Sequence, residues 1–200
     1  GAPVAQDDHA LRACRTAVRM QQALEELKLQ WRAQNLPDVD IGVGLNTGPM
    51  IVGNMGSDVR FDYTVMGDAV NLGSRLEGTN KEYGTRILMS EATWSCVKDQ
   101  VIARRLGAVR VKGKRRPVRI FELRGMGVPQ PHEAQAIQAF ESAVDAFGER
   151  RFDDAAALLE QVLAIWPDDA PSLRYLDQAA ALRQAPPAAD WDGVYTATTK

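Results

Sequence analysis

Asn71 and Arg75 are the residues of this chain whose types and spacing first point to chemistry. They lie four positions apart in a stretch that is expected to be helical, so both side chains project from one face of that helix. The rigid guanidinium fork of an arginine suits growing charge on phosphate oxygens better than a lysine does. An exposed Asn and Arg one turn apart are also typical of a solvated helix face, and the pair alone leaves both interpretations open.

Two other residues are candidates for contacting a ligand. The hydroxyl of Thr64 can both donate and accept a hydrogen bond, but threonine is also common in strands for its shape alone, and on its own Thr64 fits that interpretation. Lys114 belongs to the basic run at residues 112–116, and most such runs are solvated turns. No nucleic-acid surface is indicated, because the formal net charge is -2 and no aromatic residues are interleaved with this run.

The elements that must position these residues alternate between helical and strand periodicity. The sequence predicts, in order, a helix over 8–35, strands over 40–45, 50–52 and 61–66, a helix over 69–83, a strand over 85–89, a brief helix capped by Ser90, and strands over 101–111 and 118–123. The turn residues 46–49 are expected to join the first two strands as a hairpin, and Asp68 is expected to N-cap the helix over 69–83. This order predicts an α+β sandwich with helices on a largely antiparallel sheet.

A second, helical part is predicted after a linker at residues 126–132. Ala- and Leu-rich segments predict helices over 133–148, 152–166 and 170–184. Within them, the offsets of Ala155, Leu159, Val162 and Pro167 resemble the second helix of a tetratricopeptide repeat. Because one repeat cannot bury its faces alone, these helices are expected to dock on the preceding domain or on a protein partner. Residues 185–200 form a tail that Trp191 and Tyr195 could pin down.

Composition narrows the class of protein. The chain is 45% hydrophobic and 25% charged, which is typical of a globular protein. Cys14 and Cys96 are far apart and have no nearby His cluster, so neither a disulfide framework nor a zinc site is indicated, and a cytoplasmic setting is expected. No apolar run approaches the roughly 18–20 residues that cross a bilayer, so this segment is expected to make no membrane contact, although a longer parent chain could be anchored in the inner membrane.

The stretch from Phe61 to Glu77, FDYTVMGDAVNLGSRLE, resembles the signature of the class III adenylate and guanylate cyclases. The segments IGVGLNTGPMIVGNMGS before it, TRILMSEAT after it and VKGKRRPVRIFEL further on are similar to later segments of the same domain, in the same order. The resemblance covers about residues 1–125. It implies the ferredoxin-like-derived α/β sandwich of these cyclases, with its N-terminal strands missing from this chain, followed by the α-helical C-terminal appendix.

The resemblance also implies an activity and the residues that carry it. The expected reaction converts ATP to 3',5'-cyclic AMP and pyrophosphate, with Asn71 orienting the ribose and Arg75 stabilising the charged transition state. Lys114 matches the triphosphate-binding lysine. Adenylate cyclases commonly have Asp or Thr at the base-reading position, and guanylate cyclases commonly have Cys. The implied base pocket of this chain is lined by Thr64, Val65 and Met66.

Some parts of the family pattern have no counterpart here. The family holds two metal ions, Mg²⁺ or Mn²⁺, with two Asp residues expected upstream of Gly1, and Gly42 stands where many relatives carry a phosphate-binding Arg. The family's active site forms across a dimer, so the expected partners are a second copy or a complementary cyclase fragment, and this chain alone is expected to be inactive. A guanylate cyclase remains an alternative, as does a catalytically silent regulatory or scaffold module that binds a protein partner.

Overall fold

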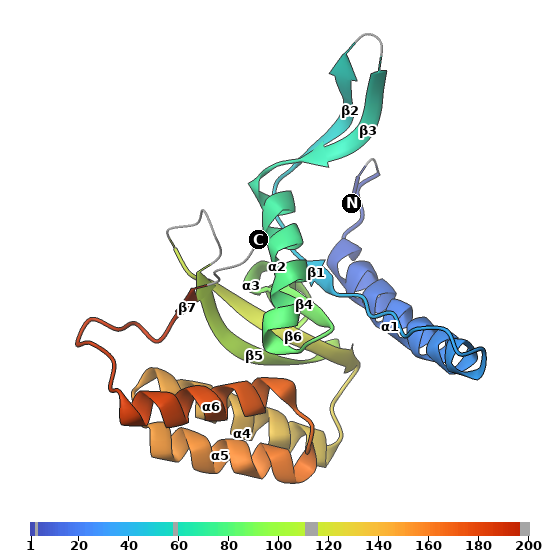
Figure 1. Cartoon of the computed structure of the whole chain (residues 1–200). Helices are drawn as coiled ribbons and strands as arrows, with labels where there is room; N and C mark the ends of the chain where they lie inside the picture. The colour runs from blue at the N-terminus through green and yellow to red at the C-terminus, as the bar shows by residue number, and fades with distance from the viewer. Residues whose placement is uncertain (3, 58–59, 111–115, 197–200) are drawn as a thin grey trace.

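The computed structural model describes residues 1–2, 4–57, 60–110 and 116–196 (Figure 1). A central sheet carries helices on both sides, and a long two-stranded arm projects away from this body. The elements are α1 (His9–Ala33), β1 (Val43–Leu45), β2 (Ile51–Ser57), β3 (Arg60–Met66), α2 (Asp68–Tyr83), β4 (Ile87–Ser90), α3 (Glu91–Val97), β5 (Val101–Arg110), β6 (Val118–Met126), α4 (Pro131–Gly148), α5 (Phe152–Ile165), α6 (Ala170–Gln184) and β7 (Tyr195–Thr196). The predicted α+β class is confirmed.

The sheet is mixed. Its strand order is β1-β4-β6-β5-β7, in which the pairs β4–β6 and β5–β6 are antiparallel and the outer pairs β1–β4 and β5–β7 are parallel. The prediction of a largely antiparallel sheet therefore holds for its centre and is wrong for its edges. Strand β1 lies at one edge, and β7 of the C-terminal tail lies at the other.

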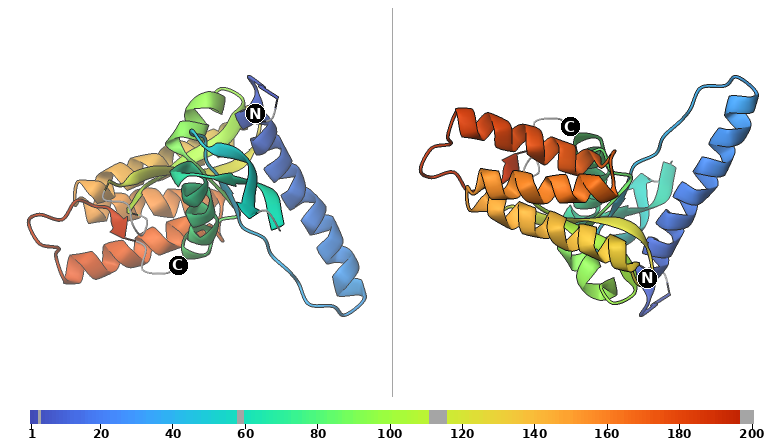
Figure 2. Two further views of the ribbon diagram at one scale, coloured as in Figure 1. Left: turned by 90° about the horizontal axis from the view of Figure 1, so that it is seen from above. Right: turned by 90° about the horizontal axis from the view of Figure 1, so that it is seen from below.

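Each face of the sheet has its own apolar core. Along β4, Leu88 points into one core, whereas its neighbours Ile87 and Met89 point into the other, as the two-residue period of a strand requires. Helices α1 and α3 cover the second core, and α2 shares the first with the C-terminal helices. In both views of Figure 2, α1 and the group α4 to α6 lie on opposite sides of the molecule.

The predicted hairpin between residues 40–45 and 50–52 is wrong. β1 pairs in parallel with β4, and β2 pairs antiparallel with β3, in a register that runs from Ile51 opposite Met66 to Ser57 opposite Arg60. The connection after β1 does not join two paired strands, and its side chains bond to other elements. The Asn46 amide donates to the carbonyl of Ala69, and the hydroxyls of Thr47 and Thr93 are 3.0 Å apart.

The helix that carries Asn71 and Arg75 begins one residue earlier than predicted. Gly67 is the N-cap of α2, whereas Asp68, the predicted cap, is the first helical residue. Gly67 has φ of +145°, a conformation that favours glycine, and its carbonyl accepts from the N–H groups of Val70 and Asn71. Asp68 still places its negative charge in the first turn, where the helix dipole favours it.

The three predicted C-terminal helices are present as α4, α5 and α6, and they dock on the sheet rather than standing apart. Phe140 and Phe147 of α4 share a core with Leu106 of β5 and Leu76 of α2. Nothing in this arrangement or in the comparisons below supports the tetratricopeptide-like interpretation. Among the described residues, no helix has both the length and the apolar character that a membrane span needs.

Candidate functional site

Asn71 and Arg75 lie on the outward side of α2. Leu72 and Leu76 face the core, whereas Asn71 is exposed and Arg75 is half-buried. Within the described residues, neither the Asn71 amide nor the Arg75 guanidinium has a side-chain hydrogen bond or an ion pair. Two polar groups one turn apart are therefore available to a ligand on the same side of one helix.

The contact between α2 and β1 leaves no room for a side chain at Gly44. A Cβ atom added to Gly44 would lie 2.1 Å from the carbonyl oxygen of Gly73 and 2.4 Å from the backbone nitrogen of Glu77. Only a glycine allows the two backbones to approach this closely. The position of α2, and with it that of Asn71 and Arg75, therefore depends on Gly44.

Asn80 fixes the other half of this contact. Its side-chain amide is buried and donates to the carbonyl of Val43 at 3.1 Å, while its oxygen accepts from the Thr85 hydroxyl at 3.0 Å. Neither Asn80 nor Asn46 was predicted from the sequence as a residue that positions the site. Asn46 ties Ala69 at the start of α2 to the connection after β1. A signal existed for Asn80, because it follows Leu72 and Leu76 at four-residue spacing, where an apolar residue is usual.

The three predicted base-pocket residues are exposed on β3. Thr64 and Met66 lie on one face of the arm and Val65 on the other, because strand side chains alternate. Thr64 is paired with Gly53 of β2, where even an added Cβ would meet nothing within 4 Å. Thr64 thus has open space beside it for a flat ligand group. Lys114 lies outside the described residues.

Gly67 is the link between the strand and the helix of this site. β3 ends at Met66 and α2 begins at Asp68, so a single residue separates the element with Thr64 from the element with Asn71 and Arg75. In the described part of the chain, no hydrogen bond joins Thr64 directly to either of the other two side chains. The chain joins the two elements directly, and the individual roles of the three side chains stay predictions.

A cavity of about 700 Å³ lies beside the N-terminal end of α2. Asp68 and Ala69 line it together with Asn46 from the connection after β1 and Arg119 of β6, and Arg119 is paired with Glu91 at 2.8 Å. This hollow adjoins the start of the helix but contains neither Asn71 nor Arg75.

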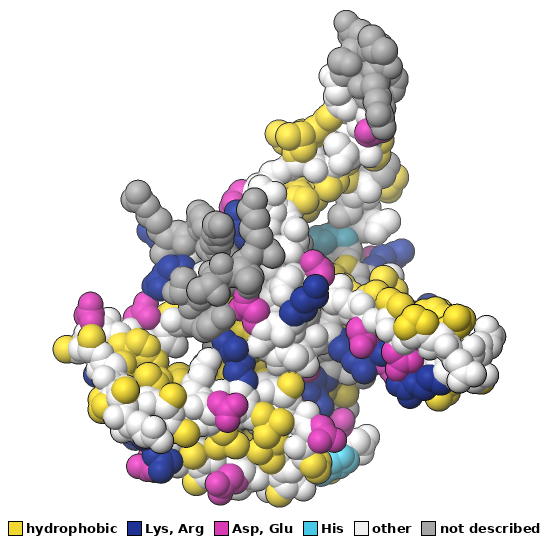
Figure 3. Space-filling view, viewed as in Figure 1, with side chains coloured by type: hydrophobic (Ala, Val, Ile, Leu, Met, Phe, Trp, Pro, Cys, Tyr) yellow, Lys and Arg dark blue, Asp and Glu magenta, His cyan; other side chains and the backbone are white. Residues whose placement is uncertain are grey.

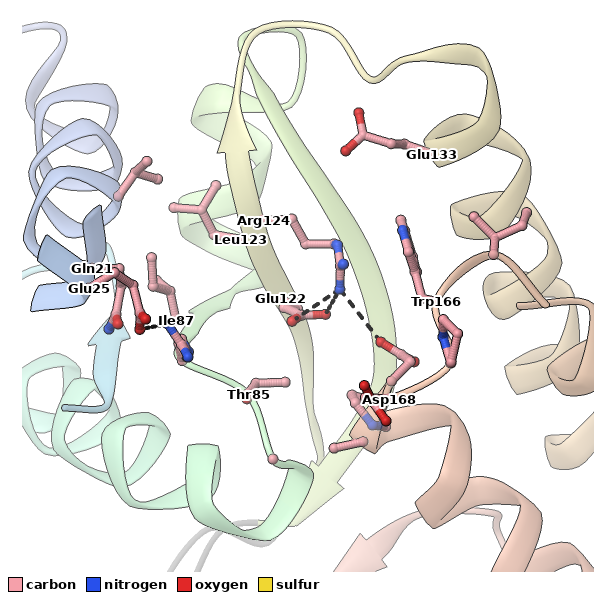
Figure 4. Close-up of a pocket in the computed structure, with 18 of the residues that line it drawn as sticks. Gln21, Glu25, Thr85, Ile87, Glu122, Leu123, Arg124, Glu133, Trp166 and Asp168 are labelled. Carbon is pink, nitrogen blue, oxygen red and sulfur yellow. Dashed lines mark hydrogen bonds and ion pairs between the residues drawn. The ribbon is translucent and has the colours of Figure 1, made fainter. Parts of the chain in front are cut away.

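A second cavity, of about 660 Å³, lies between α1, β6 and the α5–α6 connection (Figure 4). Its charged side chains largely satisfy one another: Glu25 pairs with Arg86, and Arg124 pairs with Glu122 and packs 3.8 Å above the ring of Trp166. None of the predicted site residues lines it. We therefore assign no ligand to this cavity.

The described residues do not offer a metal site. Among them, no three or more His, Cys, Asp or Glu side chains gather closely enough to hold an ion. On α1, burial raises the pKa of the Cys14 thiol to about 11. At the candidate site, the Asn71 amide can supply hydrogen bonds and the Arg75 guanidinium can neutralise negative charge.

Gly42 lies against α2, on the side of the helix that packs on the sheet. A Cβ at this position would lie 3.1 Å from the carbonyl oxygen of Glu77 and 3.3 Å from the side-chain nitrogen of Asn80. An arginine here would begin against the helix, so in this structure the residue serves the β1–α2 contact.

A family model described as the adenylate and guanylate cyclase catalytic domain matches residues 1–125. Adenylate cyclase 1 of Rhizobium meliloti is 43% identical over 125 residues, which is 62% of this chain and 19% of the relative. An adenylate cyclase of Anabaena cylindrica is 37% identical over 119 residues, or 56% of this chain and 24% of the relative. The chain thus spans less than a quarter of either relative.

Solved structures show the same fold. The adenylyl cyclase CyaB from P. aeruginosa superposes with a TM-score of 0.58 at 36% identity, with 66% of each chain covered. The guanylyl cyclase Cya2 superposes with a TM-score of 0.56 at 39% identity, again with 66% of each chain covered. Both kinds of cyclase are therefore similar to this chain to a comparable degree.

Proposed function

Because the chain belongs to the family of adenylate and guanylate cyclase catalytic domains, we propose that it forms the sugar- and base-contacting part of an adenylate cyclase, which converts ATP to 3',5'-cyclic AMP and pyrophosphate. One observation carries the proposal. Asn71 and Arg75 project together from the outward side of α2 without a partner among the described side chains. Only Gly67 separates this helix from β3, the strand that carries Thr64.

Cyclisation joins the 3'-oxygen of the ribose to the α-phosphorus while the bond from that phosphorus to the oxygen of the leaving pyrophosphate breaks. Asn71 would hold the ribose by hydrogen bonds so that the 3'-oxygen stays in line with the leaving group. Arg75 would donate to the phosphate oxygens as negative charge builds on them. Its partly buried setting favours this role, because a charge interaction strengthens where less water screens it.

The arm supports a site completed across a dimer. Ile51, Tyr63 and Met66 are large apolar side chains that the arm leaves exposed, and Figure 3 shows apolar side chains along it. The body of this chain does not cover them. A second protomer that buried them would bring its own residues next to Thr64 and α2.

The divalent ions that the family uses are proposed to be held by residues outside those described here. Strand β1 is an edge strand of the sheet, so an additional strand that carries metal ligands could pair with it. We accordingly propose that this chain alone is inactive. Mixing it with a fragment that holds the two metal-binding Asp residues should restore turnover, and full activity of the chain by itself would refute this arrangement.

Base preference decides between the two kinds of cyclase. Thr64 supports adenine, since its hydroxyl can match both a donor and an acceptor on the base edge. The comparable similarity to the guanylyl cyclase Cya2 keeps GTP as the second candidate substrate. Rates of cyclic nucleotide formation from ATP and from GTP by the complete protein distinguish them.

The roles of Asn71 and Arg75 are tested by alanine substitution in the complete protein. Arg75→Ala should lower kcat by about 10²- to 10³-fold, as removal of one transition-state donor does elsewhere, and Asn71→Ala by about 10²-fold through misplacement of the ribose. Lys81→Ala is the matched control, because Lys81 is an exposed cation on the same helix. Unchanged activity in both site variants would favour the scaffold alternative instead.

A further inference from the structure

Helix α6 reaches the C-terminal end of α2. The Arg174 guanidinium donates to the carbonyl of Glu82 at 3.1 Å and lies 4.8 Å from the centre of the Tyr83 ring. At the next residue, a Cβ added to Gly84 would come within 2.4 Å of the Cβ of Ala170. The last turn of α2 is therefore held both by a charge-assisted hydrogen bond and by direct packing.

The start of α6 is itself fixed to the sheet by buried charge. Arg104 of β5 is fully buried and donates to both carboxylate oxygens of Asp169, at 2.9 and 2.6 Å, while its Nε donates to Glu122 at 2.7 Å. Asp169 also caps α6 by accepting from the N–H and the hydroxyl of Ser172. Such a bidentate pair fixes orientation as well as distance.

A second contact anchors α6 six residues after Asp169. The buried Tyr175 hydroxyl donates to the carbonyl of Leu106 at 2.7 Å. A Cβ on Gly107, whose φ is +105°, would lie 2.8 Å from that hydroxyl oxygen, so only glycine fits beneath it. With Asp169 and Tyr175 tied to β5, Arg174 between them has a defined position from which to hold α2.

We propose that α6 is a positioning element of the nucleotide site and that Arg174 is its positioning residue for α2. This inference rests on the proposed function, because α2 matters for the reaction through Asn71 and Arg75. Glu82 lies seven residues after Arg75 on the same stripe of the helix, so Arg174 holds the far end of the stripe that carries the proposed site residues. The C-terminal helices are then part of the catalytic unit.

The experiment compares Arg174→Ala, Arg174→Lys and Arg183→Ala in the complete protein. Arg174→Ala should lower kcat by about ten- to a hundredfold with little change in KM, because a shift of α2 misplaces groups that act in the transition state. Arg174→Lys should recover most of the loss, since a lysine can still donate to the Glu82 carbonyl. Arg183→Ala removes an exposed arginine of α6 that pairs with Asp153 of α5, and it should behave as wild type.

Hydrogen exchange of this chain provides a readout that does not depend on activity. Arg174→Ala should speed exchange in the last turn of α2 while the amides of α4 and α5 keep their protection. Unchanged kcat and unchanged α2 exchange would overturn the proposal, and so would faster exchange spread evenly over α4 to α6, which indicates a stability role alone. A complete wild-type protein that cyclises neither ATP nor GTP would refute the proposed function, whereas the exchange comparison would still decide whether Arg174 holds α2.

Discussion

The proposed site relies on side chains that the rest of the described chain leaves unengaged. Several buried or partly buried arginines have internal partners: Arg104 bonds to Asp169, and Arg105 to Asp145. Arg75 is partly buried as well, but its guanidinium has no ion pair among the described residues. A cation kept near the surface without an internal partner suits a ligand that brings its own negative charge.

Thr64→Val tests the base-reading role of a single hydroxyl. Valine keeps the branched shape that suits β3 but can neither donate nor accept, so a net hydrogen bond worth about 0.5–1.5 kcal/mol is lost. We expect kcat/KM for ATP to fall about three- to tenfold in the complete protein, with the rate for GTP changed less. The steady-state ratio of the two substrates measures this effect, and an unaltered ratio would exclude Thr64 from base selection.

At the scale of the elements, local pattern predicted most helices and strands, whereas long-range pairing could not be predicted. Helix α2 follows from Leu72 and Leu76 at four-residue spacing, and the shared side of Asn71 and Arg75 follows from that helix. The parallel pairing of β1 with β4 joins residues far apart in the chain, such as Val43 and Ile87, and the turn residues after β1 do not reveal it. Strand pattern does not choose a partner strand.

The burial of Arg104 could likewise not be predicted from the sequence. Arg104 and Arg105 read as an ordinary polar pair within a strand, yet Arg104 is 0% exposed. Its partner Asp169 lies 65 residues further along the chain, and only the docking of α6 brings the two together. The roles of the proposed site residues stay predictions for a related reason, since the contacts that would define them are made to a ligand and, in the proposed arrangement, to a second protomer.

The attachment of α6 to the sheet should depend on pH through Asp169. Burial opposes ionisation of this carboxyl, but the hydrogen bonds and charge of Arg104 outweigh it and hold the pKa of Asp169 below its usual 3.8. A lowered folded-state pKa means that the stabilisation is fully present above pH 3.8 and is lost as the pH falls through the lower folded value. Asp169→Asn should lower the free energy of unfolding by about 3 kcal/mol at pH 7, since Arg104 then loses one of its two carboxylates.

Denaturant unfolding at pH 7 and at pH 3 measures this dependence. The difference between wild type and Asp169→Asn should shrink at the lower pH, because pH 3 lies below the ordinary pKa of 3.8, where the unfolded wild-type chain takes up a proton on this carboxyl more readily than the folded chain does. Asp153→Asn serves as the control: its salt bridge with Arg183 is exposed, so its removal should cost less than about 1 kcal/mol. A difference between wild type and Asp169→Asn that is the same at both pH values would contradict the linkage.

At the scale of the whole molecule, the two edges of the sheet differ: the C-terminal tail covers one edge, whereas the other edge is strand β1. The C-terminal tail returns to the sheet, where Trp191 packs edge to face on Phe147 at 5.7 Å and Asp192 pairs with Arg110, next to β7. The opposite edge, β1, has no strand beyond it among the described residues, and the arm extends from the same side (Figure 1). Association is therefore expected through the arm, not through the helical side.

Ile51→Asp tests association through the arm. Ile51 is 69% exposed in this chain, and burying its side chain in a dimer would contribute about 1.5–3 kcal/mol for each protomer. A symmetric dimer carries the substitution twice, and every 1.4 kcal/mol changes an equilibrium about tenfold, so the variant should raise the dimer dissociation constant of the complete protein by about a hundredfold or more. Sedimentation equilibrium measures this constant. Leu29→Asp on α1 is the matched control, since Leu29 is 67% exposed and lies away from the arm, and equal weakening by both variants would show that the arm is not the interface.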